Sequence, residues 1–175
     1  MSKTEILVDY INHHRIKNIK DYFTVCYARW DNAVNSFRSG DYFTAIYLSG
    51  YCIECILKYV ILKELYSKEA SKPNGLDITK IPKIYKENEF KHNLAGLIKI
   101  GNEKKIFDVP KESDFKELIK WKSEWRYAKS HNIDSEDIAK EFLDSVVEFS
   151  IQLKDNSKIK VNQFKKISST KVIGE

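Results

Sequence analysis

Arg126 and His131 are the one arginine and histidine of this chain that stand five residues apart. An imidazole exchanges protons near neutral pH without a cofactor, so His131 is suited to general acid–base catalysis. A guanidinium presents a planar fork of donors to phosphate oxygens, which suits Arg126 to stabilising negative charge at a phosphate. If the protein does chemistry, we expect it in the segment Trp121 to Ile133, which contains both residues.

Two helix-like patterns must position that segment. Before it, apolar residues at helical spacing predict a helix from about Lys111 to Tyr127. After it, Asp134 or Ser135 is expected to cap a last helix. The buried stripe of this last helix is predicted to be Ile138, Phe142, Ser145, Val146, Phe149 and Leu153.

The centre of the predicted fold lies earlier in the chain. A helical stripe from Ile16 to Phe37 ends at Ser39-Gly40-Asp41, where glycine supplies a C-cap and Asp41 caps the next helix. That next helix, about 41 to 67, is apolar on most sides and belongs at the centre of a bundle. Gly50 within it indicates close approach by a neighbouring helix. Glu54 pairs with Lys58 at i,i+4, and Glu54 needs a further partner from elsewhere in this apolar setting.

The remaining elements are shorter. A third helix is expected to begin near His92 and to end at Gly101, and a short accessory helix is expected over residues 4 to 13. These patterns predict an all-α, up-and-down bundle of about four to five helices with an N-terminal accessory helix. We expect one domain over residues 1–155, followed by a basic, weakly ordered C-terminal tail over 156–175.

Composition bounds the function. The 175 residues carry a formal charge of +5, which permits contact with nucleic acid but does not demand it. No uncharged run approaches the roughly 18 residues of a membrane span, and no signal-peptide core is visible. We therefore expect a cytoplasmic protein without membrane contact. The three cysteines, Cys26, Cys52 and Cys55, lie in apolar helical stretches and are expected to be core thiols.

Three stretches together resemble the HEPN superfamily of small helical domains. The first is Gly40-Asp41-Tyr42-Phe43-Thr44-Ala45 running into Gly50-Tyr51-Cys52-Ile53-Glu54-Cys55-Ile56-Leu57-Lys58. It is similar to a tight turn followed by the family's GY-x-x-E-x-x-LK core. The second is Lys91-His92-Asn93-Leu94 with Leu97, similar to the start of the third family helix. The third is Trp125-Arg126-Tyr127, close to the sequence that precedes the final helix in the RY-type branch.

The resemblance implies a metal-independent ribonuclease whose arginine and histidine converge at a dimer interface. His131 would act as general acid–base, and Arg126 would stabilise the transition state. Lys129, Ser130 and Tyr127 would contact the substrate. The products would be a 2′,3′-cyclic phosphate and a 5′-hydroxyl, formed without a cofactor or metal. The implied partners are RNA or a nucleotide, a second copy of the chain, and an antitoxin or nucleotidyltransferase in a toxin–antitoxin or defence setting.

The residues leave an alternative open. Tyr127 follows the arginine where active members usually carry Asn, Asp or His, and many members of the RY-type branch lack the histidine. Arg126 then has a structural role as the ion-pair partner of Glu54 or Glu124, and His131 is a surface residue. On this alternative the protein is a non-catalytic HEPN module that binds a nucleotide, nucleic acid or a partner protein. His92 is expected to be a helix N-terminal residue rather than a ligand.

Overall fold

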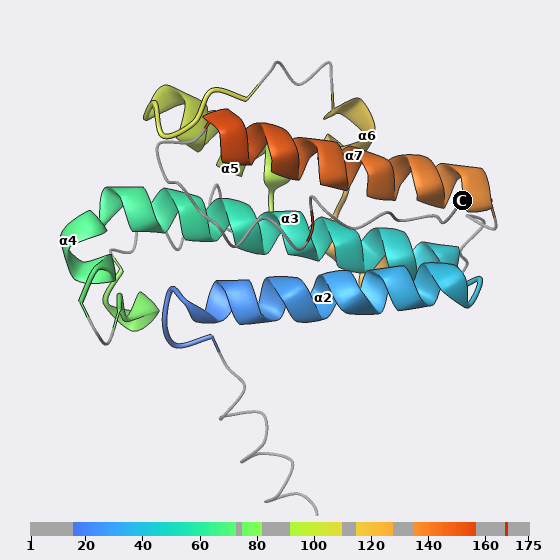
Figure 1. Ribbon diagram of the computed structural model, residues 1–175, viewed down its shortest axis with the longest axis horizontal. Coiled ribbons are helices and arrows are strands. Elements are labelled where there is room, and N and C mark those ends of the chain that lie inside the picture. Colours follow the sequence, from blue (N-terminus) through green and yellow to red (C-terminus); the bar gives the residue numbers. More distant parts are fainter. Residues whose placement is uncertain are drawn as a thin grey trace, which may run out of the picture.

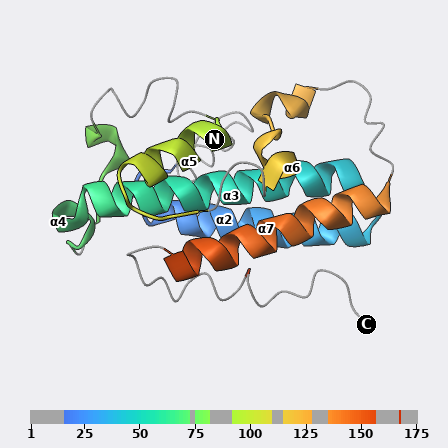
Figure 2. The same cartoon turned by 90° about the horizontal axis from the view of Figure 1, so that it is seen from above.

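A long apolar helix, α3, forms the centre of the molecule. The computed structural model describes residues 16–72, 75–81, 92–109, 115–127, 135–156 and 167. The main helices are α2 (Asp21–Arg38), α3 (Tyr42–Leu65), α5 (Leu94–Glu103), α6 (Lys116–Ile119) and α7 (Glu136–Asn156). Figure 1 shows α2 and α7 on opposite sides of α3, and Figure 2 shows α5 and α6 along a further side. The predicted all-α class is confirmed, since the described residues form helices and no strand.

The α2–α3 hairpin follows the local signals in the sequence. Gly40 has a φ of 82°, a left-handed conformation that glycine adopts at little cost. The side chain of Asp41 accepts a hydrogen bond from the backbone N–H of Thr44 at 3.1 Å, so it caps α3 as predicted. The turn and the cap together reverse the chain and pack α2 antiparallel to α3 (Figure 1).

The start of α2 differs from the prediction. The helix begins at Asp21 rather than near Ile16. The carboxylate of Asp21 accepts hydrogen bonds from the backbone N–H groups of Lys17 and Asn18, both at 2.8 Å, which holds these residues in a turn. Ile19 is nevertheless buried, so the apolar pattern marked the core correctly but not the helix boundary.

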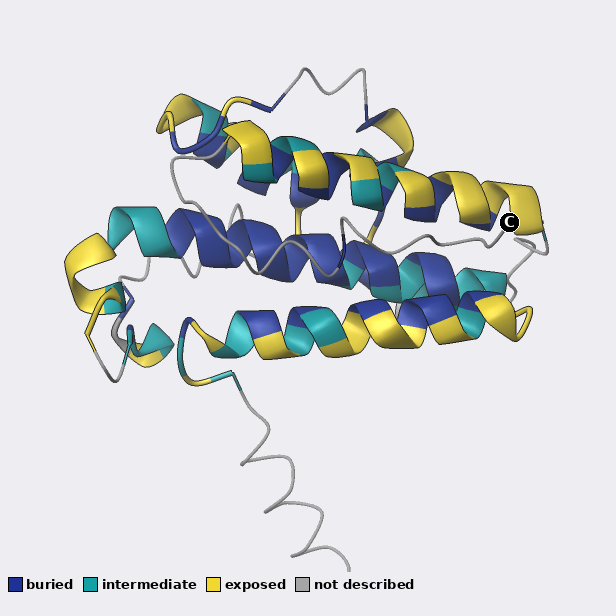
Figure 3. Cartoon of the chain, in the orientation of Figure 1, coloured by how far each residue is buried: buried dark blue, intermediate teal, exposed yellow. Residues whose placement is uncertain are grey.

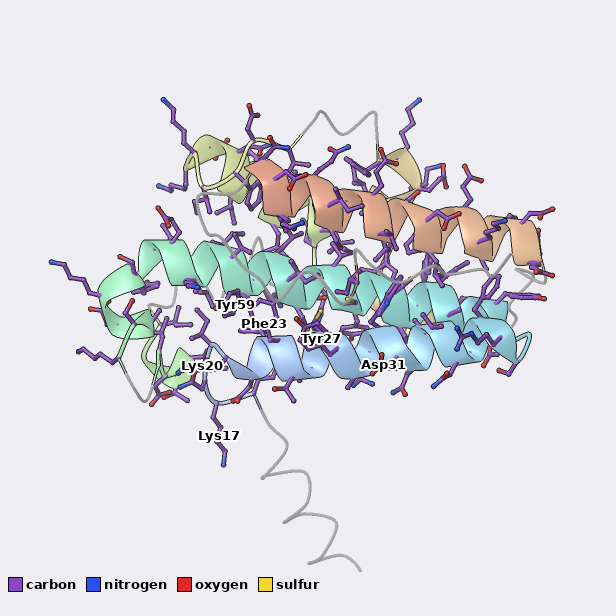
Figure 4. All side chains as sticks on the ribbon, in the orientation of Figure 1. Lys17, Lys20, Phe23, Tyr27, Asp31 and Tyr59 are labelled. Carbon is purple, nitrogen blue, oxygen red and sulfur yellow. The ribbon has the colours of Figure 1, made fainter. Side chains whose placement is uncertain are left out.

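Burial of α3 on almost every side confirms its central place. Figure 3 shows the middle of this helix as continuously buried, and its charged residues Glu54 and Lys58 are buried too. By length and composition α3 could cross a membrane, but 83% of its most apolar window is covered by the rest of the bundle. The rings of Phe23 and Tyr59 pack edge-on between α2 and α3, with centroids 3.9 Å apart (Figure 4).

Helix α7 runs parallel to α3. The hydroxyl of Tyr42, at the start of α3, donates to the carboxylate of Glu136, at the start of α7, at 3.3 Å. The side chain of Ser135 accepts a hydrogen bond from the backbone N–H of Ile138 at 3.4 Å, so Ser135 caps the start of α7. Most of the predicted stripe is buried, but Ile138 is 52% exposed and Ser145 is only partly buried. Ala139, Leu143 and Ser150 complete the buried face.

Two helix predictions were wrong. The expected continuous helix from Lys111 to Tyr127 is, within the described residues, a single turn (α6) and a 3-10 segment, η4 (Ser123–Tyr127). The break lies at Trp121, which leaves the helical path to insert its indole against α3. Gly101 does not end α5, which continues to Glu103; instead the ring of Phe107 packs where a side chain at Gly101 would lie.

The connections contain two further short elements, α4 (Ser67–Ala70) and η1 (Ile78–Lys80). The predicted accessory helix over 4–13 lies outside the described residues. Of residues 157–175 the structure describes Ile167, which is 1% exposed and belongs to the core. The remainder of the predicted tail lies outside the described part of the chain.

Candidate functional site

The predicted catalytic segment is described as far as Tyr127. The backbone of Arg126 and Tyr127 lies in η4, directly before the gap that precedes α7. The side chains of both residues, and all of Lys129, Ser130 and His131, lie outside the described structure.

Trp121 fixes the chain that leads into η4. Its side chain is buried, and its indole N–H donates to the backbone carbonyl of Tyr47 at 3.0 Å. The indole lies against Gly50, where a Cβ atom would overlap it. The close approach predicted at Gly50 is thus real, but it comes from a side chain rather than from a helix backbone. This contact places η4 beside the first half of α3.

Trp125 is the second anchor of η4. Its ring lies 6.3 Å from that of Phe43, centroid to centroid, and it is partly buried. Beside it is a hollow of about 430 Å³ between α6, η4 and the first turns of α7. The hollow is lined by Ile46, Glu117, Lys120, Trp125, Ile138, Glu141 and Phe142. Its floor is apolar and its rim is charged, and the exposed Ile138 forms part of its wall.

A second group of functional side chains surrounds Glu54. This residue is 3% exposed, and its two carboxylate oxygens have different partners. Oε1 accepts from the Lys58 ammonium at 2.6 Å, and Oε2 lies 2.9 Å from Nδ1 of His92. The further partner expected for Glu54 is therefore His92, which directly precedes the N-cap residue of α5, Asn93. A buried carboxylate needs such partners because its desolvation is costly.

The environment of Glu54 alters the titration of nearby groups. Burial raises the pKa of the Cys55 thiol well above its ordinary range, and Cys26 and Glu54 add to this effect. Lys58 and Arg29 oppose it. Burial, followed by the charges of Cys55 and Glu54, raises the pKa of Tyr22 to about 12.

The three cysteines are free and buried, as expected for core thiols. The sulfur atoms of Cys26 and Cys52 lie 3.1 Å apart across the α2–α3 interface. Within the described residues no three His, Cys, Asp or Glu side chains gather in a way that would hold a metal ion.

Sequence reasoning placed Glu54 and Lys58 correctly but did not connect His92 to them. It left Arg126 as a possible partner of Glu54, and that ion pair stays a prediction because the arginine side chain is not described. The sequence offered one signal for this contact: Glu54, buried beside Lys58, needs a further hydrogen-bonding partner. Nothing local to His92 identifies that partner, which lies 38 residues away.

Comparison with family models, with curated proteins and with solved structures finds no match for this chain.

Proposed function

We propose that this protein is a HEPN-type, metal-independent endoribonuclease of a toxin or defence system, acting in the cytoplasm as a homodimer. Arg126 and His131 carry the reaction. Lys129, Ser130 and Tyr127 contact the RNA, and an antitoxin or nucleotidyltransferase is the expected partner. The proposal originates in the three sequence motifs that resemble this superfamily, and the all-α bundle is compatible with it.

The hydrogen bonds made by Glu54 favour a catalytic role for Arg126 over a structural one. The Lys58 ammonium already compensates the charge of this carboxylate, and His92 occupies its second oxygen. A third cation is therefore not required at Glu54, which favours a role for Arg126 at a phosphate group over an ion pair with Glu54. The hydrogen bond from Trp121 to α3 also holds the chain in place where η4 begins. Catalytic groups need such fixed supports, because their geometry must be held accurately.

In the proposed mechanism His131 removes the proton of a ribose 2′-hydroxyl, which attacks the adjacent phosphorus. The bond to the 5′-oxygen breaks, and that oxygen takes up the proton of the His131 imidazolium, directly or through solvent water, which restores the neutral imidazole. The guanidinium of Arg126 stabilises the negative charge that builds up on the phosphate oxygens. The reaction leaves a 2′,3′-cyclic phosphate and a 5′-hydroxyl, and water is not consumed.

The test is RNA cleavage by the purified full chain in the presence of EDTA, followed by analysis of the product ends. We expect cyclic phosphate ends from the wild type and a loss of at least about 100-fold for Arg126→Ala and for His131→Ala. Lys99→Ala, at a side chain that is 64% exposed on α5, is the control and should cleave as the wild type does.

The proposal fails if the wild type leaves RNA intact in EDTA, or if both variants cleave like the wild type while folding normally by circular dichroism. Failure of His131→Ala alone to reduce cleavage would exclude the acid–base role of that residue. Saturable RNA binding without cleavage would favour the non-catalytic HEPN module instead.

A further inference from the structure

His92 is held in a specific orientation at the surface of the bundle. Its Nδ1 contacts a carboxylate that is almost fully buried, whereas its own side chain is 43% exposed. Its ring meets the edge of the Tyr51 ring, with centroids 5.7 Å apart. A histidine whose Nδ1 is bound to a carboxylate keeps one defined ring nitrogen, Nε2, for a ligand. This arrangement is independent of Arg126 and His131.

Arg29 of α2 borders the same tyrosine. Its guanidinium lies 6.0 Å from the centroid of the Tyr51 ring, and the residue is exposed. The tertiary fold therefore brings an exposed arginine and an oriented histidine to one tyrosine ring, from α2 and from the start of α5. Among the described residues, no carboxylate forms an ion pair with Arg29.

The local charge balance is positive. Arg29 and Lys58 contribute two cations, and Glu54 contributes the one nearby carboxylate that the described contacts place in this group. Tyr22 on α2 and Cys55 on α3 keep their protons at neutral pH because burial raises the pKa of each. Among these described residues, the charges near an anion at Arg29 and His92 therefore sum to one positive unit.

We propose that Arg29 and His92 form a binding site for a phosphate group. In the bound state both nitrogens of His92 are protonated: Nδ1–H donates to Glu54 and Nε2–H donates to the anion. The guanidinium of Arg29 donates to the other oxygens of the anion. Glu54 is the positioning residue, because its Oε2 holds Nδ1 of His92.

Sulfate is the first probe, because it stays a dianion near neutral pH and its own protonation does not affect the measured binding. Sulfate binding is followed by NMR through the ring signals of His92, which are assigned with His92→Gln. We expect saturable binding at pH 6 and a change in the Nε2 signal of His92 on binding.

Two variants and one matched control test the site. His92→Gln and Arg29→Gln should each weaken sulfate binding by about tenfold or more, since each removes a charge-assisted hydrogen bond. Arg38→Gln makes the same change of charge at an exposed arginine on the opposite face of α2, nine residues or about 13 Å along the helix axis from Arg29. This control should change the affinity by less than about twofold.

The source of the phosphate group is distinguished by three further probes, namely inorganic phosphate, adenosine 5′-monophosphate and the dinucleotide ApA. A preference for the first two indicates a terminal phosphate, and a preference for ApA indicates an RNA backbone phosphate. The proposal is overturned if sulfate does not bind saturably, if the His92 ring signals do not respond, or if Arg29→Gln behaves like Arg38→Gln. Each variant is checked for folding by its unfolding midpoint.

Discussion

The indole of Trp121 lies directly against the backbone of Gly50, in the space that any larger residue at that position would occupy. The same indole donates its N–H to the carbonyl of Tyr47, one turn earlier on α3. This contact ends the predicted fourth helix and sets where η4 begins. It therefore links the most buried helix to the segment that carries the proposed catalytic arginine.

Gly50→Ala should destabilise the protein, although alanine is the better helix former by about 1 kcal/mol. The added methyl group overlaps a buried ring, and overpacking of this kind typically costs about 1–3 kcal/mol or more. We expect a net loss of about 1–2 kcal/mol in urea unfolding. The control is the same substitution in a Trp121→Leu background, where the smaller side chain leaves room. If Gly50→Ala costs as much there as in the wild type, the two residues are not coupled.

Glu54→Leu should be strongly destabilising because it leaves the buried Lys58 ammonium without its carboxylate. We expect a cost of about 3–5 kcal/mol for the single variant. Glu54→Leu combined with Lys58→Met should recover at least half of that loss, since both charges are then removed together. Urea unfolding at pH 7 measures both.

The exposed pair Glu117–Lys120 provides the matched control, since its ion pair has the same 2.6 Å distance. Glu117→Leu should change the free energy of unfolding by less than about 1 kcal/mol, because solvent screens the pair. A double variant at Glu54 and Lys58 that is no more stable than Glu54→Leu would contradict the assignment of a coupled buried pair.

The stability of the protein should fall in mild alkali. The folded state keeps the proton of Cys55 at a pH where the unfolded chain releases it, because burial raises the pKa of this thiol. The unfolded state is therefore favoured as the pH rises above the ordinary thiol pKa of about 8.5. The loss amounts to at most about 1.4 kcal/mol per pH unit from this thiol. Tyr22, whose pKa is raised to about 12, adds a further loss above pH 10.

Urea unfolding at pH 7.5, 8.5, 9.5 and 10 measures this dependence. Cys55→Ala should be less stable at neutral pH but should lose less stability between pH 8.5 and 10. An identical alkaline slope in the variant and the wild type would show that Cys55 does not titrate differently in the two states.

Local signals account for the parts of the fold that were predicted correctly. The turn at Gly40 and the cap at Asp41 depend on residues within a few positions of each other, so the sequence determines them directly. The central place of α3 follows from its apolar composition, since a helix that is apolar on most sides must be covered by others. The burial of the three cysteines follows for the same reason.

The tertiary structure alone decided the features that depend on distant residues. Trp121 interrupts a regular helical pattern because Gly50 offers a backbone surface on another helix, and periodicity within the segment carries no trace of that surface. Ile138 fits the helical stripe of α7 but lines an open hollow, because α6 and η4 do not cover it. The pairing of His92 with Glu54, and the approach of Arg29 to the same tyrosine, arise from helix packing. The sequence by itself determined the turn at Gly40, the cap at Asp41 and the central helix α3, because these signals act between residues close together in the chain. Packing between helices decided where the 111–127 segment breaks and which polar side chains meet, because those contacts join residues far apart in the chain.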